Sequence, residues 1–543
     1  MLLQSLLRPV LTPIMRGIFD PAQSIAAAWS PLSLWPDGID SPGMWISPRT
    51  LTSEWQDYTG TTPVSVPGTV ADTSNPVGLA YDLRAGDPVL GPELVVNGDF
   101  SNGTTGWTGQ NGGTCAVVGG ELEVTAGAGF YGGVYQTLTL VVGRMYLLTG
   151  RMRCGTSPRA EVRIDYAVSP YTTSTTDFDI QLYFVAPYAS NNIQLNPALA
   201  TVGDTCFYSN ISVKEVPGNH MLQSTSAARP LLSARVNQLT FTEDFSNAVW
   251  LLLFGLEKTP NYALAPDGSM TACRLYAPTV DGTLYGHGVI NNSFTRSVWV
   301  KSNTASNYTV LMPGAAPITV TPTWARISAS EAGNNYLWNM GVVAGGDISI
   351  WHPQVELGTT ATTYQSVPGD GSTYATDFPI FQKYDGVDDG MATAAFTAGT
   401  LISGMDCMIP VRRDSAFYQL MVGLYDSSNP YRWFGFAQDG GSSSCVSNAG
   451  SPTVWVDGVQ LSGGTAVTGG TLSSALTVGD WHILEFRNLD LSVWVNANFG
   501  NYGSGYQFNG ARGDIMLYPS TDSTADKDAA RQYLADYYGV TLP

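Results

Sequence analysis

ELVVNGDFSNGTTGW (residues 93–107) and NQLTFTEDFSNAVW (residues 237–250) begin in the same way. Each starts with a short apolar stretch, continues into Asp-Phe-Ser-Asn and reaches a tryptophan. Alternating segments then lead to CFYSNISVKEV (206–216) in the first case and to DISIWHPQVELGTTATTYQSV (347–367) in the second. This internal repeat predicts two similar β modules of about 120–130 residues each.

The rest of the chain also has an apolar period of two, in short runs separated by Gly, Asn, Asp, Ser and Pro. Examples are ELEVTAG (121–127), AEVRIDYAV (160–168), TRSVWVKS (295–302), TVWVDGVQL (453–461) and LDLSVWVNA (489–497). Such runs predict an all-β, multi-domain chain of β-sandwich or jelly-roll units.

One segment, STADKDAARQYLADYYGV (523–540), has helical spacing instead. Ala530, Tyr533, Leu534 and Tyr537 fall on one face, and Gly539 suits a left-handed stop. We expect a short C-terminal helix here.

Composition excludes several kinds of protein. The 543 residues predict three or four domains, since a domain typically has ~150 residues. A chain with 44% hydrophobic residues can bury a core, which argues against disorder. The net charge is −19, and the few lysines cannot form the basic patches that neutralise phosphates. We therefore expect neither nucleic acid nor a membrane surface as a partner.

The first twenty residues, MLLQSLLRPVLTPIMRGIFD, are strongly apolar. Arg8, Pro9, Pro13 and Arg16 divide them, so no run has the length of a signal-peptide core or of a spanning helix. We expect a protein made in the cytoplasm without a signal peptide. Residues 1–40 are either a frayed tail or an arm that anchors the protein in a larger assembly.

The six cysteines have no C-x-x-C spacing, which argues against a zinc site and against a dense disulfide framework. They are Cys115, Cys154, Cys206, Cys273, Cys407 and Cys445. Isolated buried thiols are the favoured interpretation, and a bridge among Cys115, Cys154 and Cys206 stays open.

No catalytic constellation stands out. Glycan hydrolysis needs two carboxylates at a set separation, and the nearest pattern, Glu121 and Glu123, lacks a third acid. The four histidines form no metal or triad motif. Asp385, Asp388 and Asp389 are the densest acidic cluster, and a turn is favoured there over a calcium or catalytic site. We expect no enzyme and no catalytic residues.

Several segments of the sequence resemble parts of three known families. NGDFS and SVKEV resemble the first and last strands of carbohydrate-binding-module-like jelly rolls. The second module resembles the version found in bacteriophage fibre and spike proteins, on APDG (265–268), Gln354, Glu356 and Tyr364. MWISPRTLTSEWQDYTGTTPVSVPGTV (44–70), GNHMLQSTSAARPLL (218–232) and FQKYDGVDDGM (381–391) resemble parts of a concanavalin-A/laminin-G-like sandwich of phage virion proteins.

Together the resemblances imply nested domains. Residues 91–216 and 236–367 would be two jelly rolls inserted into one discontinuous lectin-like sandwich, formed by 41–90, 217–235 and 368–543. An N-terminal arm, 1–40, would precede it.

The combination resembles a tailed-bacteriophage virion appendage. It implies a structural fibre or decoration subunit in the virion, with host-surface glycan and other virion proteins as partners and a homo-oligomer, a trimer above all. The alternatives are a polysaccharide depolymerase tailspike and a secreted bacterial lectin.

Aromatic residues can stack on sugar rings. The candidates for glycan binding are Tyr131, Tyr135, Trp107, Trp433 and Tyr431. Glu93 and Asn97 resemble positions that hold a structural calcium in carbohydrate-binding jelly rolls, although Ser209 and Asn210 stand where an Asp is usual. No other cofactor is expected.

Overall fold

The computed structural model describes residues 29–86, 90–129, 131–291, 293–332, 334–396, 400–414, 419–462, 466–503 and 506–543. In these ranges nearly all regular structure is β, which confirms the predicted fold class. Two α-helices accompany the strands in the part of the chain that the structure describes, and neither has the length and apolar character that a bilayer crossing needs.

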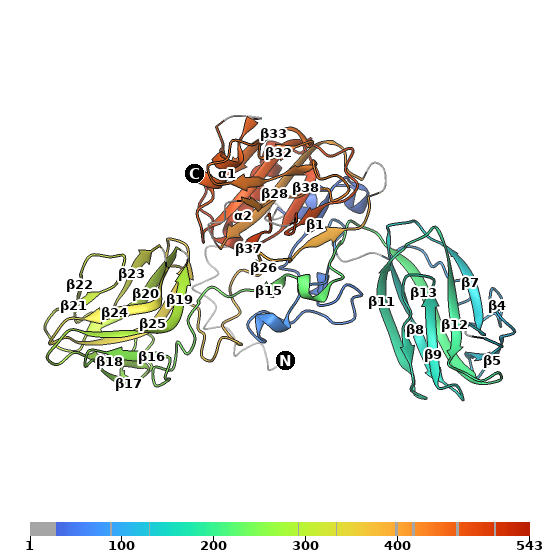
Figure 1. The fold of residues 1–543 in the computed structure, drawn as a ribbon, viewed down its shortest axis with the longest axis horizontal. Helices are drawn as coiled ribbons and strands as arrows, with labels where there is room; N and C mark the ends of the chain where they lie inside the picture. Colours follow the sequence, from blue (N-terminus) through green and yellow to red (C-terminus); the bar gives the residue numbers. More distant parts are fainter. Residues whose placement is uncertain are drawn as a thin grey trace, which may run out of the picture.

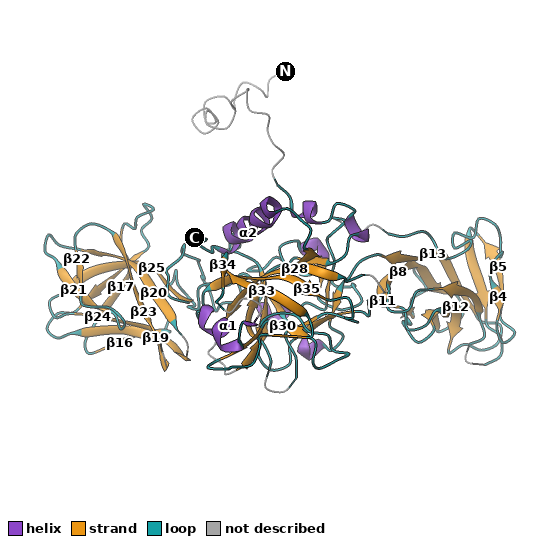
Figure 2. Cartoon of the chain, turned by 90° about the horizontal axis from the view of Figure 1, so that it is seen from above, coloured by secondary structure: helices purple, strands orange, loops and turns teal. Residues whose placement is uncertain are grey.

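The strands form three units. Two jelly rolls lie on opposite sides of a central sandwich, as Figures 1 and 2 both show. The first jelly roll is drawn in green-blue and the second in yellow-green in Figure 1, whereas the central sandwich combines blue, green and red segments of the chain.

The central sandwich contains a nine-stranded and a five-stranded sheet. The larger sheet consists of β1 (Met44–Ile46), β15 (Leu231–Ser233), β26 (Phe381–Asp385), β28 (Ser403–Arg413), β33 (Gly450–Val456), β34 (Val459–Gln460), β35 (Trp481–Asp490), β37 (Asn509–Arg512) and β38 (Ile515–Pro519). The smaller sheet consists of β2 (Glu54–Trp55), β3 (Leu79–Ala80), β14 (Met221–Leu222), β27 (Met391–Thr393) and β36 (Asn498–Phe499). Two short pairs, β29 (Gln419–Met421) with β31 (Phe436–Gln438) and β30 (Trp433–Phe434) with β32 (Val446–Ser447), lie outside this pattern.

This sandwich is discontinuous in sequence. In its smaller sheet, β14 pairs with β3 on one side and with β27 on the other. In its larger sheet, β15 pairs with β26, and β1 pairs with β38. Strands from before, between and after the jelly rolls therefore share the same sheets, as the sequence predicts.

The first jelly roll has two five-stranded sheets. One follows the order β10 (Tyr171–Thr172), β9 (Arg159–Ile164), β12 (Ser190–Ala198), β7 (Val134–Thr139), β4 (Thr108–Gly109). The other follows the order β11 (Phe178–Val185), β8 (Met145–Cys154), β13 (Thr205–Val216), β6 (Glu121–Thr125), β5 (Thr114–Val118).

The second jelly roll repeats this plan. One sheet follows the order β16 (Trp250–Leu253), β19 (Gly282–Asn291), β24 (Asn334–Val342), β21 (Tyr308–Leu311), β22 (Ile318–Val320). The other follows the order β17 (Glu257–Ala263), β18 (Ala272–Tyr276), β25 (Asp347–Leu357), β20 (Phe294–Ser302), β23 (Ala325–Glu331).

The C-terminal helix, α2 (Thr524–Tyr538), forms where the apolar spacing predicts it. The Ser523 hydroxyl caps its start by accepting from the Asp526 amide at 3.1 Å, and Gly539 ends it with φ of 72°. Ala530 and Leu534 are buried against the larger sheet of the central sandwich.

The last residues of the predicted arm belong to this same core. Trp35 is 2% exposed, stacks on Trp45 and donates its indole N–H to the Leu517 carbonyl at 3.1 Å. Trp29 donates to the Asp526 carboxylate at 3.2 Å. Residues 29–40 thus pack on the central sandwich, and residues 1–28 of the predicted arm lie outside the described residues.

Two local predictions need correction. TVWVDGVQL is not one run, because Asp457 and Gly458 take positive φ and turn it into the hairpin β33–β34. LDLSVWVNA ends as a strand at Asp490, whose carboxylate accepts from the Ser492 amide and starts a turn. A short helix, α1 (Gly469–Ala475), precedes β35 and is capped by Thr468.

All six cysteines are free thiols in the structure, and five of them are buried. Cys154 and Cys206 lie directly opposite each other on β8 and β13. The thiols are therefore free, as the favoured interpretation has it, but Cys115 is only half-buried and Cys154 and Cys206 are cross-strand neighbours rather than isolated.

Apolar contacts attach the first jelly roll to the central sandwich. Tyr183, on β11, is 7% exposed and meets Tyr81 edge to face at 5.4 Å, while its backbone amide donates to the Thr59 carbonyl at 2.7 Å. Met145 and Leu79 lie in the same buried cluster. The second jelly roll meets the sandwich where the Thr359 amide donates to the Asp480 carboxylate at 3.2 Å.

A buried polar network crosses the central sandwich. Glu54, 1% exposed, accepts from the Gln382 side chain at 2.5 Å, and its second oxygen has no hydrogen-bond partner among the described residues. Gln382 in turn accepts from Tyr384 and from the buried Arg512. Burial is the main cause that raises the pKa of Glu54 to about 8, against the opposing effect of Arg512.

We expect Glu54→Gln to remove a pH dependence of stability. The pKa in the folded state exceeds the ordinary value of 4.5, so the stabilisation is complete below that pH and is lost as the pH rises through about 8. For the wild type this loss amounts to roughly 2 to 4 kcal/mol. Thermal unfolding at pH 5, 7 and 9 measures it, with the exposed Glu257→Gln as control. A Glu54→Gln variant with an undiminished pH slope would contradict this assignment.

Candidate functional site

One sheet of the first jelly roll divides its side chains between a core face and an outer face. Ile193 and Leu195 on β12 point into the core. The intervening Gln194 faces outward, and the strand register places it between Tyr135 of β7 and Arg163 of β9. This row of Tyr135, Gln194 and Arg163 is the centre of what we call the outer face of the first jelly roll.

A glycine-rich loop supplies a second tyrosine to this face. The Gly127 amide donates to the Gly132 carbonyl at 2.8 Å, and a Cβ on Gly132 would lie 2.6 Å from the Gly127 backbone. Only glycines allow this approach. The loop holds Tyr131 beside Arg163, whose guanidinium carbon lies 4.6 Å from the ring centroid and which donates to the Tyr131 hydroxyl.

The polar side chains of the face are fixed by one another. Gln194 donates to the Asp165 carboxylate at 2.8 Å and accepts from the Asn196 amide at 3.4 Å. Gln194 and Asn196 are 5% and 1% exposed, so their rotamers are set by burial as well as by hydrogen bonds. These side chains therefore form a preorganised polar layer.

A second arginine and tyrosine lie at the far edge of the sheet. The Arg159 guanidinium carbon is 3.7 Å from the centroid of the Tyr171 ring, and this ring is 53% exposed. Arg159 also forms an ion pair with Glu161 at 3.4 Å. Glu161 accepts from the Ser169 hydroxyl as well, which keeps the carboxylate engaged.

This face has the chemistry that suits a sugar. Tyrosine rings can stack on the apolar faces of sugar rings, and amides, carboxylates and guanidinium groups bind hydroxyls. Glu161 and Asp165 are held by cationic, hydroxyl or amide partners, so they act as fixed acceptors on the sheet.

The predicted glycan-binding residues do not all meet. Tyr131 and Tyr135 lie on the outer face of the first jelly roll, on the loop and on the strand that follows it. The prediction that Trp107 binds glycan needs correction. This residue is 7% exposed, packs in the core and donates to the Asn97 carbonyl at 3.3 Å. Its ring presents no open face to a sugar. The tryptophan that follows the Asp-Phe-Ser-Asn motif therefore packs in the core of its module, as Trp250 does in the second jelly roll.

Tyr431 and Trp433 lie in the central sandwich, away from the outer face of the first jelly roll. Tyr431 is 68% exposed, while Trp433 is half-buried against Phe436 at 5.3 Å. They form no common surface with Tyr131 and Tyr135.

Glu93 and Asn97 do not fit a calcium site, which corrects the expectation drawn from the resemblance. One Glu93 oxygen accepts from the amides of Leu94, Val95 and Val213 at 3.1, 3.0 and 3.0 Å. The other accepts from the Ser212 hydroxyl at 2.5 Å. Asn97 donates to two loop carbonyls and accepts from the Asn102 amide at 2.9 Å. Both side chains close backbone structure and leave no shared set of free oxygens for an ion.

The acidic cluster at Asp385, Asp388 and Asp389 is a turn between β26 and β27. Its oxygens lie within 4.8 Å of one another, but they accept from backbone amides of the same turn, such as Asp385 N at 2.9 Å and Val387 N at 2.8 Å. Burial, reinforced by the two neighbouring carboxylates, raises the pKa of Asp389 to about 7.

Several residues of the face were missed from sequence. Arg163 and Glu161 stand at the polar positions of AEVRIDYAV, and Gln194 and Asn196 at those of NIQLNPA. The alternation shows that these side chains leave the core. The alternation does not show that Tyr131, from another loop, lies beside these side chains.

No family model and no curated protein matches this chain. Among solved structures, it is similar to the N-terminal CBM22-1-CBM22-2 tandem domain from Paenibacillus barcinonensis Xyn10C, with 12% identity, coverage of 50% of this chain and 98% of that chain, and a TM-score of 0.20. It is also similar to the enzymatically active domain of bacteriophage CBA120 tailspike protein 4, with 17% identity, coverage of 22% and 21%, and a TM-score of 0.17. Likenesses with scores this low carry no inference about function.

We expect Glu93→Gln to destabilise the first jelly roll by roughly 1 to 2 kcal/mol, because an amide nitrogen cannot accept from the clustered N–H and O–H donors. Thermal unfolding measures the change, with Glu123→Gln on the same module as control. EDTA should leave the wild-type unfolding temperature unchanged. A fall in that temperature on adding EDTA would show that Glu93 holds an ion after all.

Proposed function

We propose that this chain is a non-enzymatic virion protein of a tailed phage, a fibre or decoration subunit, that binds glycans of the host surface. The observation that carries glycan binding is the outer face of the first jelly roll, where Tyr131, Tyr135, Gln194 and Arg163 meet. Half-buried tyrosine rings beside fixed hydrogen-bonding groups can recognise sugars without needing a catalytic pair.

The phage attribution is supported by the sequence. NQLTFTEDFSNAVW and the closing phrase with Gln354, Glu356 and Tyr364 resemble modules of phage fibre and spike proteins. These residues form hydrogen bonds within the module: Gln354 donates to Glu356 at 2.8 Å, and Tyr364 donates to Glu243 at 2.7 Å. The resemblance therefore concerns residues that build the module.

Other virion proteins are the proposed partners of the N-terminal arm. Trp29 and Trp35 fix the start of the described chain to the central sandwich, so a segment that precedes them has a rigid attachment point. Self-association into a homo-oligomer is also part of this proposal. The preference for a trimer rests on the resemblance to phage fibres.

We expect Tyr135→Ala and Arg163→Ala to weaken glycan binding about ten-fold or more each, since each removes a stacking or charged contact worth at least ~1.4 kcal/mol. Retention on polysaccharides prepared from the host measures it, with the exposed Tyr188→Ala on the same jelly roll as control. Equal retention of all variants would contradict a site on this face. New reducing ends in the polysaccharide would contradict a non-enzymatic role.

Deleting residues 1–28 should abolish incorporation into particles while leaving the unfolding of the central sandwich unchanged, because Trp29 and Trp35, which hold the chain on the sandwich, are retained. Particles assembled in cells that express the truncated chain, probed by immunoblot, measure incorporation. Deleting residues 1–40 instead should destabilise the sandwich, because it removes the buried Trp35. Normal incorporation of the shorter truncation would rule out the arm as an anchor.

A further inference from the structure

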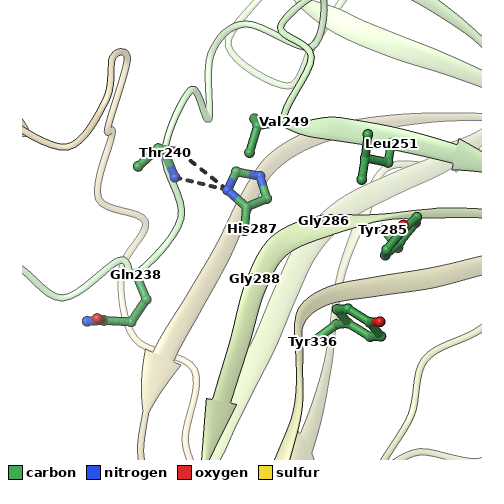
Figure 3. A pocket seen from close by; sticks show the side chains of 9 residues that line it. All are labelled: Gln238, Thr240, Val249, Leu251, Tyr285, Gly286, His287, Gly288 and Tyr336. Atoms are coloured by element: carbon green, nitrogen blue, oxygen red, sulfur yellow. Dashed lines mark hydrogen bonds between the residues drawn. The ribbon is translucent and has the colours of Figure 1, made fainter.

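A cavity of about 550 Å³ opens on the second jelly roll, over β16, β19 and β24. Figure 3 shows its lining: Tyr285, Tyr336 and Leu251 on one side, Gln238 and Thr240 on the other, and His287 between them. Its volume is typical of ligand pockets, which span roughly 300–1,000 Å³.

Two tyrosines form the most exposed wall. Their ring centroids lie 5.3 Å apart with the planes nearly perpendicular, and the Tyr336 side chain is 45% exposed. Leu251, next to them on β16, is 43% exposed. Apolar and aromatic surface of this extent on the rim of a cavity favours a ligand with an apolar face.

A bulge in β19 shapes the floor. The register shifts between Gly286 and Val289, and His287 and Gly288 have φ of 63° and 73°. A Cβ on Gly286 would lie 2.1 Å from the Val249 carbonyl, so only glycine fits there. Bulges and left-handed residues of this kind are concentrated at binding sites, where they redirect side chains.

His287 is a fixed and uncharged part of this floor. Its Nδ1 accepts from the Thr240 amide at 3.3 Å, and its ring meets Trp250 at 4.3 Å. Burial lowers the pKa of His287 to about 4, so the ring is neutral at pH 7. The other lining residues are Gln238, Thr240, Val249, Leu251, Tyr285, Gly286, Gly288 and Tyr336, none of which carries a charge.

The absence of charge from the lining selects among ligands. An acidic sugar needs a cation to balance it, and a basic ligand needs a carboxylate. A neutral sugar ring needs only aromatic faces for its C–H groups and neutral partners for its hydroxyls, which here are Gln238, Thr240 and the two phenols. The outer face of the first jelly roll differs, because Arg159, Glu161, Arg163 and Asp165 give it charges of both signs.

We propose that this cavity is a second glycan site of the chain, specific for uncharged sugar rings. The proposal rests on the proposed function only for the ligand class, glycan, and it concerns a different module and different residues. Tyr285 and Tyr336 are the stacking residues, and Gln238 and Thr240 bind hydroxyls.

The test is a binding array that is probed with the full chain. It holds uncharged polysaccharides, among them dextran, mannan and xylan, and uronic-acid polysaccharides such as alginate and hyaluronate. Tyr285→Ala and Tyr336→Ala should each lower binding of an uncharged polysaccharide at least ten-fold. Tyr262→Ala, on the other sheet of the same module, is the matched control, since its side chain is also 45% exposed. Circular dichroism and unfolding temperature establish that each variant is folded.

The outcomes separate the two proposals. Loss of uncharged-glycan binding in the Tyr285 and Tyr336 variants, with Tyr135→Ala unaffected, supports this site even if the first jelly roll binds nothing. Binding that depends only on Tyr135 and Arg163 overturns this site and leaves the proposed function intact. Binding of acidic glycans alone, or no binding of any uncharged polysaccharide, also overturns it. Sedimentation that shows self-association lost in Leu251→Ser, without any glycan effect, would make this face a contact between copies instead.

Discussion

Each jelly roll is inserted into another domain, so its first and last residues must be held together, and the rest of the structure depends on this constraint. In the second jelly roll two buried side-chain amides, of Asn237 and Gln365, hold these ends together. The Asn237 side chain donates to the carbonyls of Pro353 and Gln365 and accepts from the Val355 amide at 3.1 Å. Gln365 accepts from the amides of Val236 and Asn237 at 2.7 and 3.0 Å. Both side chains are fully buried with their hydrogen bonds made, which fixes where the chain enters and leaves.

The first jelly roll meets the same constraint with a carboxylate. The Gly91 amide donates to the Glu215 carbonyl at 2.8 Å, and the Glu93 carboxylate accepts from the Val213 amide and the Ser212 hydroxyl, which links the opening segment of the module to its last strand. This explains why a residue that resembles a calcium ligand serves another purpose. An ion in that position would have to displace hydrogen bonds that close the module. Closing both insertions also places β14 and β15 beside the strands they complete, so the central sandwich depends on the modules that interrupt it.

The fold could be predicted from sequence because local pattern and final structure agree. Ala160, Val162 and Ile164 alternate with polar residues, and they are buried in the core of β9. The prediction fails where a single polar side chain stops a strand, as Asp490 does through the Ser492 amide. The closing residues Asn237 and Gln365 could not be found, because their partners lie more than a hundred residues away and an isolated amide has no signature. The same limit applies to the site: Tyr131 and Tyr135 could be proposed from their loop, but Arg163 becomes part of it only when β9 is placed two strands away.

The attachments of the modules affect how the two proposed sites would act together. Tyr183 and Met145 are buried against the central sandwich, and Asp480 holds the start of the turn that leaves the second jelly roll. Modules that are attached by packed contacts of this kind do not sample many separations. The two sites would therefore be presented at a fixed separation, on opposite sides of the central sandwich, where Figure 1 shows the modules. Fixed spacing raises avidity only for surfaces whose sugars match it, and it gives nothing for a short free oligosaccharide. A chain with one charged and one uncharged face would then discriminate a surface by two chemically different sugars at once, which neither module could do alone.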